Sequence, residues 1–172
     1  MQFITYLSDY PQYAGAILIV LMFLESLPVT GFFIPGIFIL PLLGAVTASS
    51  DNSFWYLYIC VACGALLGDV SGFWLGRLEA HKWQPNILNR YRQNTVQHSY
   101  AFIKKHGLLA LFLGRFVWLI HPAIPGAAGL LKVKFNHFIL IDTPAILLWA
   151  LFYMGGGHLL TGLWFSHLAK WL

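Results

Sequence analysis

Apolar residues fill four long blocks of the chain, and each block contains one charged side chain. The blocks lie between Asp9 and Asp51 (41 residues), Asp51 and Arg77 (25 residues), Lys105 and Lys132 (26 residues), and Lys134 and Lys170 (35 residues). A spanning helix needs about 20 apolar residues, so blocks of this length predict an integral membrane protein. A charge inside a bilayer is costly and usually faces a partner in the protein interior. The first functional candidates are therefore Glu25, Asp69, Arg115 and Asp142.

The second block predicts an uninterrupted spanning helix over residues 53–76. One face of this helix contains Asp69 together with three small residues, Gly64, Gly68 and Gly72. Glycines spaced in this way let a neighbouring helix approach closely.

The fourth block predicts a second spanning helix over residues 135–154. We expect it to end at Gly155-Gly156-Gly157, because glycine weakens a helix. Residues 157–172 are then expected to form a short C-terminal tail helix.

The first and third blocks are interrupted by proline and glycine. In lipid, a broken backbone is tolerated only where it is buried in protein or lines a wet cavity. We expect a helix over residues 12–26, followed by a re-entrant helical hairpin over 27–46 that turns near Pro35 and Gly36. The third block predicts a second re-entrant hairpin over 107–131, with Pro125 and Gly126 at its turn.

The two hairpins resemble each other at a constant offset of 90 residues. Glu25 aligns with Arg115, Pro35 with Pro125, and Gly36 with Gly126. This predicts an inverted repeat of residues 12–76 and 107–156 within a single membrane domain, 1–172. The predicted fold is an all-α membrane protein with two oppositely inserted re-entrant hairpins flanked by transmembrane helices. Glu25 and Arg115 would then meet near the midplane, able to pair with each other or with a substrate.

Residues 77–106 form a basic connection between the two halves. Glu79 is its only acidic residue, against six basic ones: Arg77, Lys82, Arg90, Arg92, Lys104 and Lys105. The positive-inside rule places this connection in the cytoplasm. Spaced apolar residues within 86–105 predict an amphipathic helix at the membrane surface.

Composition supports a membrane protein and excludes several other classes. Hydrophobic residues make up 59% of the chain and charged residues 9%, whereas a soluble domain has about 25% charged residues. A soluble enzyme, a disordered chain and a coiled coil are excluded. The net charge of +4 indicates orientation in the membrane rather than nucleic-acid binding. We interpret Cys60 and Cys63 as buried packing residues, and we expect no metal and no cofactor.

Three segments carry a family resemblance. FLESLP, GALLGDVSGFWLGR and GRFVWLIHPAIPGAAG resemble the DedA family of bacterial inner-membrane proteins, whose VTT domain also occurs in eukaryotic lipid scramblases. The resemblance implies a multi-pass protein of the bacterial inner (plasma) membrane that acts as a flippase for a lipid phosphate. The implied substrate is undecaprenyl phosphate or a phospholipid such as phosphatidylethanolamine, with support from the proton motive force. It implies membrane lipids as partners and leaves homo-oligomerisation open.

The chain departs from the family pattern at several positions. Ile37 replaces an acidic residue, and His121 replaces a second arginine six residues after the first. Trp118 replaces a proline, and Asp142 replaces an asparagine of the last helix. Two explanations are open: a divergent branch with another substrate, or a transfer of the missing roles to Asp69, Asp142 and His121.

Three residues are predicted to act on the substrate directly. Arg115 is the expected phosphate contact, because a guanidinium stays charged and binds phosphate with two donors. Glu25 is either a proton-binding carboxyl group or a structural partner of Arg115, since burial favours the neutral form of a carboxyl group. His121 either shuttles a proton or shares the phosphate, the alternative being a packing residue beside Pro122.

The two aspartates and the tryptophans have weaker assignments. Asp69 is expected to bind substrate or couple protons, or else to accept a structural hydrogen bond. Asp142 is assigned to proton coupling, although its closeness to the polar end of its helix favours a surface position near the membrane edge. Trp149 is interpreted as an interface anchor or a packing residue.

Two other functions stay open besides transport. Arg115-x5-His121 resembles one segment of a membrane lipid-phosphate phosphatase signature, but Pro125 occupies the position of its aspartate. The histidine therefore lacks the expected orienting carboxylate, and we do not expect an enzyme. The third possibility is a non-transporting membrane scaffold whose charges are only structural.

Overall fold

The computed structural model describes most of the four apolar blocks. The described residues are 11–28, 30–31, 36–49, 54–79, 98, 105, 107, 109–117 and 120–163. Within these ranges the chain is helical and contains no β-strand, which confirms the all-α prediction. Most of the basic connection, including nearly all of the predicted amphipathic helix at 86–105, lies outside the described residues.

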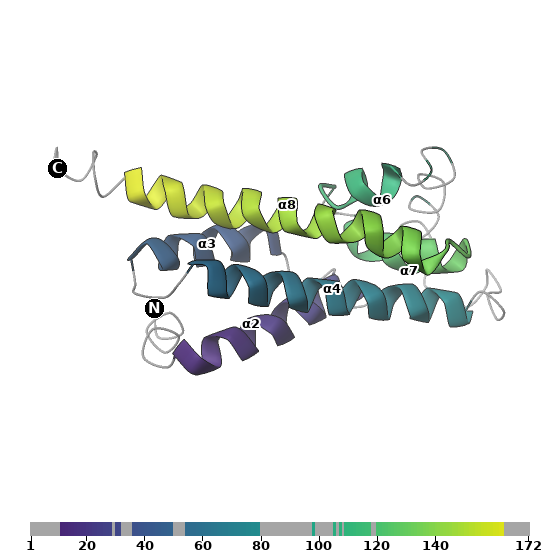
Figure 1. Ribbon diagram of the computed structural model, residues 1–172, viewed down its shortest axis with the longest axis horizontal. Coiled ribbons are helices and arrows are strands. Elements are labelled where there is room, and N and C mark those ends of the chain that lie inside the picture. The colour runs from purple at the N-terminus through teal and green to yellow at the C-terminus, as the bar shows by residue number, and fades with distance from the viewer. Residues whose placement is uncertain are drawn as a thin grey trace.

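Two long helices form the axis of the molecule, as Figure 1 shows. Within the described ranges, α4 (Phe54–Glu79) and α8 (Phe135–Leu163) are the helices long and apolar enough to cross a membrane. They run antiparallel. At one end Arg77 Nη1 donates to the carbonyl of Val133 (3.1 Å), and at the other the rings of Phe54 and His158 lie 5.3 Å apart. The predicted helix at 53–76 is present over the described residues from Phe54 onward and continues to Glu79.

The prediction that the last helix ends at its triple glycine is wrong. α8 continues through these glycines to Leu163. Inside a membrane no water competes for the backbone hydrogen bonds of a helix, so glycine weakens it less. Gly157 also has a packing role, because a Cβ there would overlap the backbone of Pro41 in α3 (Gly36–Ser49). Residues 157–163 of the predicted tail thus belong to α8, and 164–172 lie outside the described residues.

The first broken block differs from the hairpin predicted at 27–46. α2 (Pro11–Ser26) ends directly before a non-helical segment at Leu27, and α3 begins at Gly36. Pro28 has no N–H with which to continue the helix. The N–H of Gly31 donates to the carbonyl of Leu27 (2.9 Å) and closes a turn. The helix predicted over 12–26 is therefore confirmed, the break begins directly after it at Leu27, and Gly36 is the first residue of the next helix rather than part of the turn. Pro35 lies outside the described residues.

The second broken block turns earlier than predicted. α6 (Leu109–Gly114) stops before Arg115, and turns lead to the short 3-10 helix η1 (His121–Ala123) and then α7 (Ile124–Leu130). Pro125 and Gly126 lie in the first turn of α7, where proline is tolerated because its missing N–H would have no helical partner. The prediction that they form the turn is wrong. The close approach of α7 to α4 at this point depends on Gly76 of α4, where a Cβ would overlap the carbonyl of Gly126.

In each half of the chain, one short helix packs on α4 and the other packs on α8. α2 packs on α4 and α6 packs on α8, whereas α3 packs on α8 and α7 packs on α4. α2 packs closely against the glycine face of α4. Cβ atoms on Gly64 and Gly68 would overlap backbone or side-chain atoms of α2. That confirms the predicted close approach. Two related halves of opposite orientation would give this exchange. The inverted repeat and the re-entrant insertion stay predictions.

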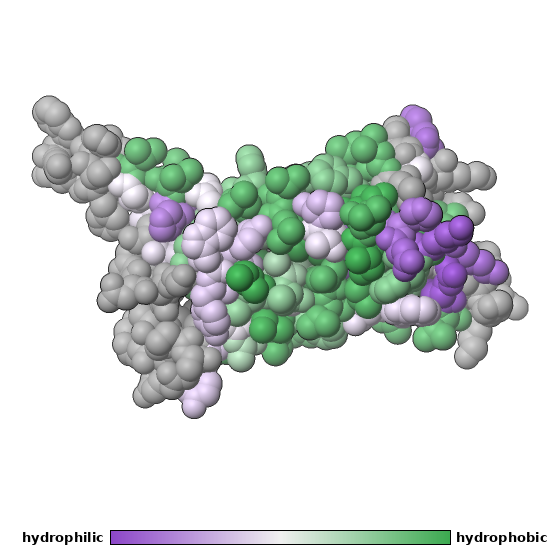
Figure 2. Space-filling view, viewed as in Figure 1, coloured by the Kyte–Doolittle hydropathy of each residue, from purple (hydrophilic) through white to green (hydrophobic). Residues whose placement is uncertain are grey.

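The surface matches a protein that crosses a bilayer. Figure 2 shows apolar side chains over the middle of the molecule and hydrophilic ones gathered where α4 ends and α8 begins. Lys132 and Lys134 are exposed in the turn between α7 and α8, and Lys132 has a positive φ of 57°. Exposed Cys63 lies on the long helix α4, whereas Cys60 is buried, so the prediction of two buried cysteines is right only for Cys60.

Candidate functional site

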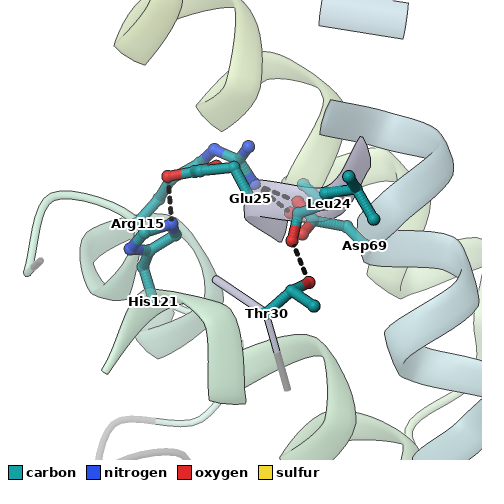
Figure 3. A network of polar contacts seen from close by, with 7 residues as sticks. Leu24, Glu25, Thr30, Asp69, Arg115 and His121 are labelled. Carbon is teal, nitrogen blue, oxygen red and sulfur yellow. Dashed lines mark hydrogen bonds and ion pairs between the residues drawn. The ribbon is translucent and has the colours of Figure 1, made fainter. Parts of the chain in front are cut away.

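The four single charges of the apolar blocks meet at one place in the protein interior, together with His121. Their residues are between 0 and 5% exposed: Glu25 0%, Asp69 0%, Arg115 4%, Asp142 4% and His121 5%. Figure 3 shows side chains from separate helices pointing toward one another. The prediction of Asp142 as a surface residue near the membrane edge is therefore wrong. The antiparallel packing of α4 and α8 brings it to the level of Asp69. We call these five residues the charged cluster.

The charged cluster is positioned by helix ends as well as by helix interiors. Glu25 lies in the last turn of α2, and Arg115 directly follows the last residue of α6. His121 begins η1. Asp69 and Asp142 lie inside the two long helices. Both breaks in the chain therefore come next to the charges, as expected where a backbone is interrupted around a polar site.

Arg115 joins the two long helices through their aspartates. Its Nη1 donates to Oδ2 of Asp69 and lies 3.7 Å from Oδ1 of Asp142. The indole ring of Trp149 lies beneath the guanidinium, with Cζ 5.0 Å from the ring centroid, a cation–π arrangement. The alternative prediction for Asp69, that it accepts a structural hydrogen bond, is therefore confirmed.

Glu25 pairs with His121 rather than with Arg115. Oε1 of Glu25 lies 3.1 Å from Nε2 of His121, as the dashed line in Figure 3 shows. The contact connects α2 of the first half to η1 of the second half. The predicted alternative of a structural Glu25–Arg115 pair is thus wrong in this structure. A single sequence shows which charges are buried, but not which of them face each other.

The backbone at the end of α2 is closed by local hydrogen bonds. The hydroxyl of Thr30 donates to the carbonyl of Leu24, which the end of the helix leaves without an internal partner. This bond lies beside the charged cluster in Figure 3. The last turn of α2 is therefore closed by a residue of the segment that follows it, without a side chain of the charged cluster.

Several buried polar atoms of the cluster have no hydrogen-bond partner among the described residues. They are Nε and Nη2 of Arg115, Oε2 of Glu25, Oδ1 of Asp69, Oδ2 of Asp142 and Oγ of the adjacent Ser26. Leaving a buried polar group unsatisfied costs about 1–3 kcal/mol, and more for a charged group. So many together are expensive for a core that serves only to hold helices. They are what a site that receives a polar ligand requires.

The free atoms of Arg115 lie on one edge of its guanidinium. Nη1 is held by Asp69, while Nε and Nη2 have no partner in the described part of the chain. The N–H groups of Nε and Nη2 point in the same direction and form a two-donor fork that matches two oxygens of a phosphate or carboxylate. Asp69 thus holds the guanidinium at Nη1, and the Nε–Nη2 edge is left to bind an anion.

Comparison with known proteins agrees with this architecture. The VTT domain matches residues 15–159. The chain belongs to the VTT domain family. It is 32% identical over 150 residues to the inner membrane protein YabI of Escherichia coli, covering 86% of this chain and 58% of YabI. It is 27% identical over 154 residues to Escherichia coli DedA, covering 88% of this chain and 70% of DedA. No solved structure matches.

This VTT-domain chain is a DedA-family protein of the bacterial inner membrane. A further relative, 28% identical over 149 residues, is the Escherichia coli inner membrane protein YqjA, and the match covers 84% of this chain and 66% of YqjA. The chain thus spans about 58% of the length of YabI. All five residues of the charged cluster lie within the matched domain.

Sequence reasoning missed Trp149 as part of the site. Trp149 is 3% exposed and contacts both Arg115 and the ring of His121, whose centroid lies 6.2 Å away. One signal was present, since Trp149 lies seven residues after Asp142, two turns along the same face of the helix. Among the described residues no group of three or more His, Cys, Asp or Glu is arranged to hold a metal ion.

Proposed function

We propose that this VTT-domain protein moves a lipid phosphate between the leaflets of the bacterial inner membrane, with Arg115 as the headgroup contact. The observation that carries the proposal is the free Nε–Nη2 edge of Arg115, buried in a membrane protein and braced by Asp69 and Trp149. A phosphate is the anionic group that lipids present most often, and it fits this fork with two oxygens. The lipids in question are undecaprenyl phosphate and phospholipids such as phosphatidylethanolamine.

The position of the site supports transport rather than storage of a lipid. Arg115 directly follows the end of α6, His121 begins η1, and Glu25 lies in the last turn of α2. Transporters use interrupted helices of this kind to form a substrate site within the membrane, around which halves of the protein rearrange. The contacts of the cluster connect the halves, so a ligand that replaces one of them changes how the halves are held together.

We also propose that protons accompany the phosphate. Three carboxyl groups, one guanidinium and one imidazole share the cluster. A phosphate that enters brings further negative charge beside Glu25, Asp69 and Asp142, and like charges in a buried site repel strongly. Uptake of a proton by Glu25, or through its contact His121, would offset that repulsion. This gives the proton coupling assigned to Glu25, Asp69 and Asp142 a physical basis.

The test is a leaflet-transfer assay on the purified chain in phosphatidylcholine vesicles. Fluorescent forms of undecaprenyl phosphate, phosphatidic acid and phosphatidylethanolamine are added, and a membrane-impermeant reductant bleaches only the outer leaflet. We expect the protein to make the inner-leaflet pool of at least one of these lipids accessible faster than vesicles without protein do. Equal rates for all three lipids with and without protein would refute the proposal and favour a scaffold.

One observation favours phosphatase chemistry as a second candidate. His121 lacks a carboxylate at the sequence position where a phosphatase signature has one, but Glu25 of another helix lies 3.1 Å from its Nε2. A histidine oriented by a carboxylate, next to an arginine that binds phosphate, is an arrangement used for nucleophilic attack. Release of inorganic phosphate from the two phosphomonoesters, undecaprenyl phosphate and phosphatidic acid, decides it, because transport leaves the phosphate ester intact.

A further inference from the structure

A groove on the lipid-facing side of the molecule lies between α4 and α8. It has a volume of about 210 Å³. Its walls are seven side chains, of which Thr143 is the only polar one: Ile59, Ala62, Cys63, Leu66, Thr143, Ile146 and Leu147. Pockets for whole small molecules are usually about 300–1,000 Å³. The groove is therefore too small for a lipid headgroup and its chains, but suits a segment of one hydrocarbon chain.

The groove begins beside the charged cluster. Leu66 precedes Asp69 by three residues on α4, and Thr143 directly follows Asp142 on α8. At a rise of 1.5 Å per residue, the α4 wall of the groove starts about 5 Å from the level of Asp69 and extends about 10 Å further, to Ile59. It leads away from the basic end of the molecule, because α4 and α8 run antiparallel.

Polar contacts tie the two walls together at both ends of the groove. At the inner end, Arg115 contacts Asp69 of α4 and Asp142 of α8. Near the outer end, the hydroxyl of Tyr58 donates to the carbonyl of Leu147 (2.9 Å). A hydrogen bond across lipid-exposed helices has no water to replace it, so the spacing of the walls is held. The hollow is thus a fixed feature of the α4–α8 seam.

We propose that this groove holds the hydrocarbon chain of the lipid whose phosphate binds Arg115. The inference rests on the proposed function, which places the headgroup, and adds the position of the hydrocarbon chain. Continuity carries it: the apolar hollow begins within about one helical turn of the two aspartates that contact Arg115. A polyprenyl phosphate has the same order of parts, with an anionic group joined directly to a hydrocarbon chain.

The experiment is photo-crosslinking in vesicles. The probe is a polyprenyl phosphate that carries a diazirine within the first ten or so carbons of its chain. The matched probe is a phosphatidylcholine with the same diazirine in its acyl chain. After illumination, peptide mass spectrometry locates the label. We expect the phosphate probe to label Leu66 or Ile146, and the phosphatidylcholine probe to label these positions no more than other lipid-facing residues.

Two variants separate a bound chain from ordinary lipid that fills the hollow. Ala62→Trp fills the groove and should remove labelling of Ile146, whereas Ala16→Trp, the same change at an exposed position on α2, should not. Arg115→Ala should lower groove labelling by about tenfold or more, since that is the affinity that one charge-assisted hydrogen bond represents. Labelling that is unchanged in Arg115→Ala, or equal for both probes, would show bulk lipid and overturn the inference.

The same samples distinguish this inference from the proposed function. Leaflet transfer without groove labelling would keep the function and overturn the inference. Groove labelling that depends on Arg115, without leaflet transfer, would keep the site for the hydrocarbon chain and refute transport. Exposed Cys63 tests a further occupant, a second copy of the chain. Efficient disulfide formation between copies through Cys63 would mean that the groove is an interface between copies, and would overturn the inference.

Discussion

Two places in the molecule join helices through polar side chains in the interior or at its edge, and they differ in how completely those side chains are paired. At the contact of α3 with α8, Thr47 Oγ1 donates to the carbonyl of Gly44 (2.7 Å) and lies 3.0 Å from Nδ1 of His158. In the charged cluster, Arg115 and three carboxyl groups leave several atoms without partners among the described residues. The first place is a finished structural link. The second has the unsatisfied groups that a ligand site needs.

The largest expected effect comes from removing Arg115. Arg115→Ala should lower leaflet transfer of a lipid phosphate by about 100-fold or more, because two donors to the phosphate are lost. It should also destabilise the protein by about 3–5 kcal/mol, since Asp69 is left buried and unpaired. Transfer in vesicles and thermal unfolding in detergent measure the two effects.

A double variant separates these two effects. Arg115→Ala combined with Asp69→Ala removes the unpaired charge, so much of the stability should return while transfer stays lost. Recovery of transfer in the double variant would mean that Arg115 serves structure alone, and that the charged cluster is a link of the same kind as Thr47–His158.

A smaller effect is expected at Glu25. Glu25→Gln keeps the shape of the side chain but cannot take up and release a proton, so transfer should fall by about 10- to 100-fold. In the unchanged protein, transfer should rise as the pH is lowered, because protons reduce the repulsion between the phosphate and the carboxyl groups of Glu25, Asp69 and Asp142. Rates measured between pH 5 and pH 8 should be flatter for the variant. An unchanged pH response would remove Glu25 from the proton step.

Trp149 should matter less, because its contact supports Arg115 without touching the substrate. Trp149→Leu removes the cation–π contact, worth about 0.5–2 kcal/mol, and should slow transfer by about 2- to 30-fold. Trp149→Phe keeps an aromatic face and should restore part of the rate. Equal rates in both variants would assign Trp149 to packing only.

The smallest effect is expected where the polar groups are already paired. Thr47→Val removes the hydroxyl that contacts Gly44 and His158, so stability should fall by about 1 kcal/mol. The rate of transfer should not change, because this contact lies apart from the charged cluster. A large loss of transfer would show that the α3–α8 contact takes part in the cycle, and would erase the contrast between the two places.

The sequence alone predicts the buried charges but not their pairing. A single charge within an apolar block must face the protein interior, and this holds for Glu25, Asp69, Arg115 and Asp142. Which of them meet depends on the direction and level of packed helices, and on those grounds the prediction misplaced Asp142 at the membrane edge.

Helix ends are the other part that the sequence predicts poorly. Pro28 does end α2, because proline cannot donate to the preceding turn. Pro125 and Gly155 lie inside helices, because a first-turn proline costs little and a membrane stabilises helical backbone. The same residue type ends a helix in one place and lies within a helix in another, so tertiary packing decides where a helix ends.

The central claim is that the free edge of Arg115 binds the phosphate of the transported lipid, and Arg115→Lys tests it most directly. Lysine keeps the charge near Asp69 but has no Nε–Nη2 fork. Leaflet transfer of fluorescent undecaprenyl phosphate or phosphatidic acid is compared in vesicles that hold equal amounts of folded protein. The account predicts that the lysine variant folds and inserts but loses most of the transfer. Transfer at the rate of the unchanged protein would contradict it.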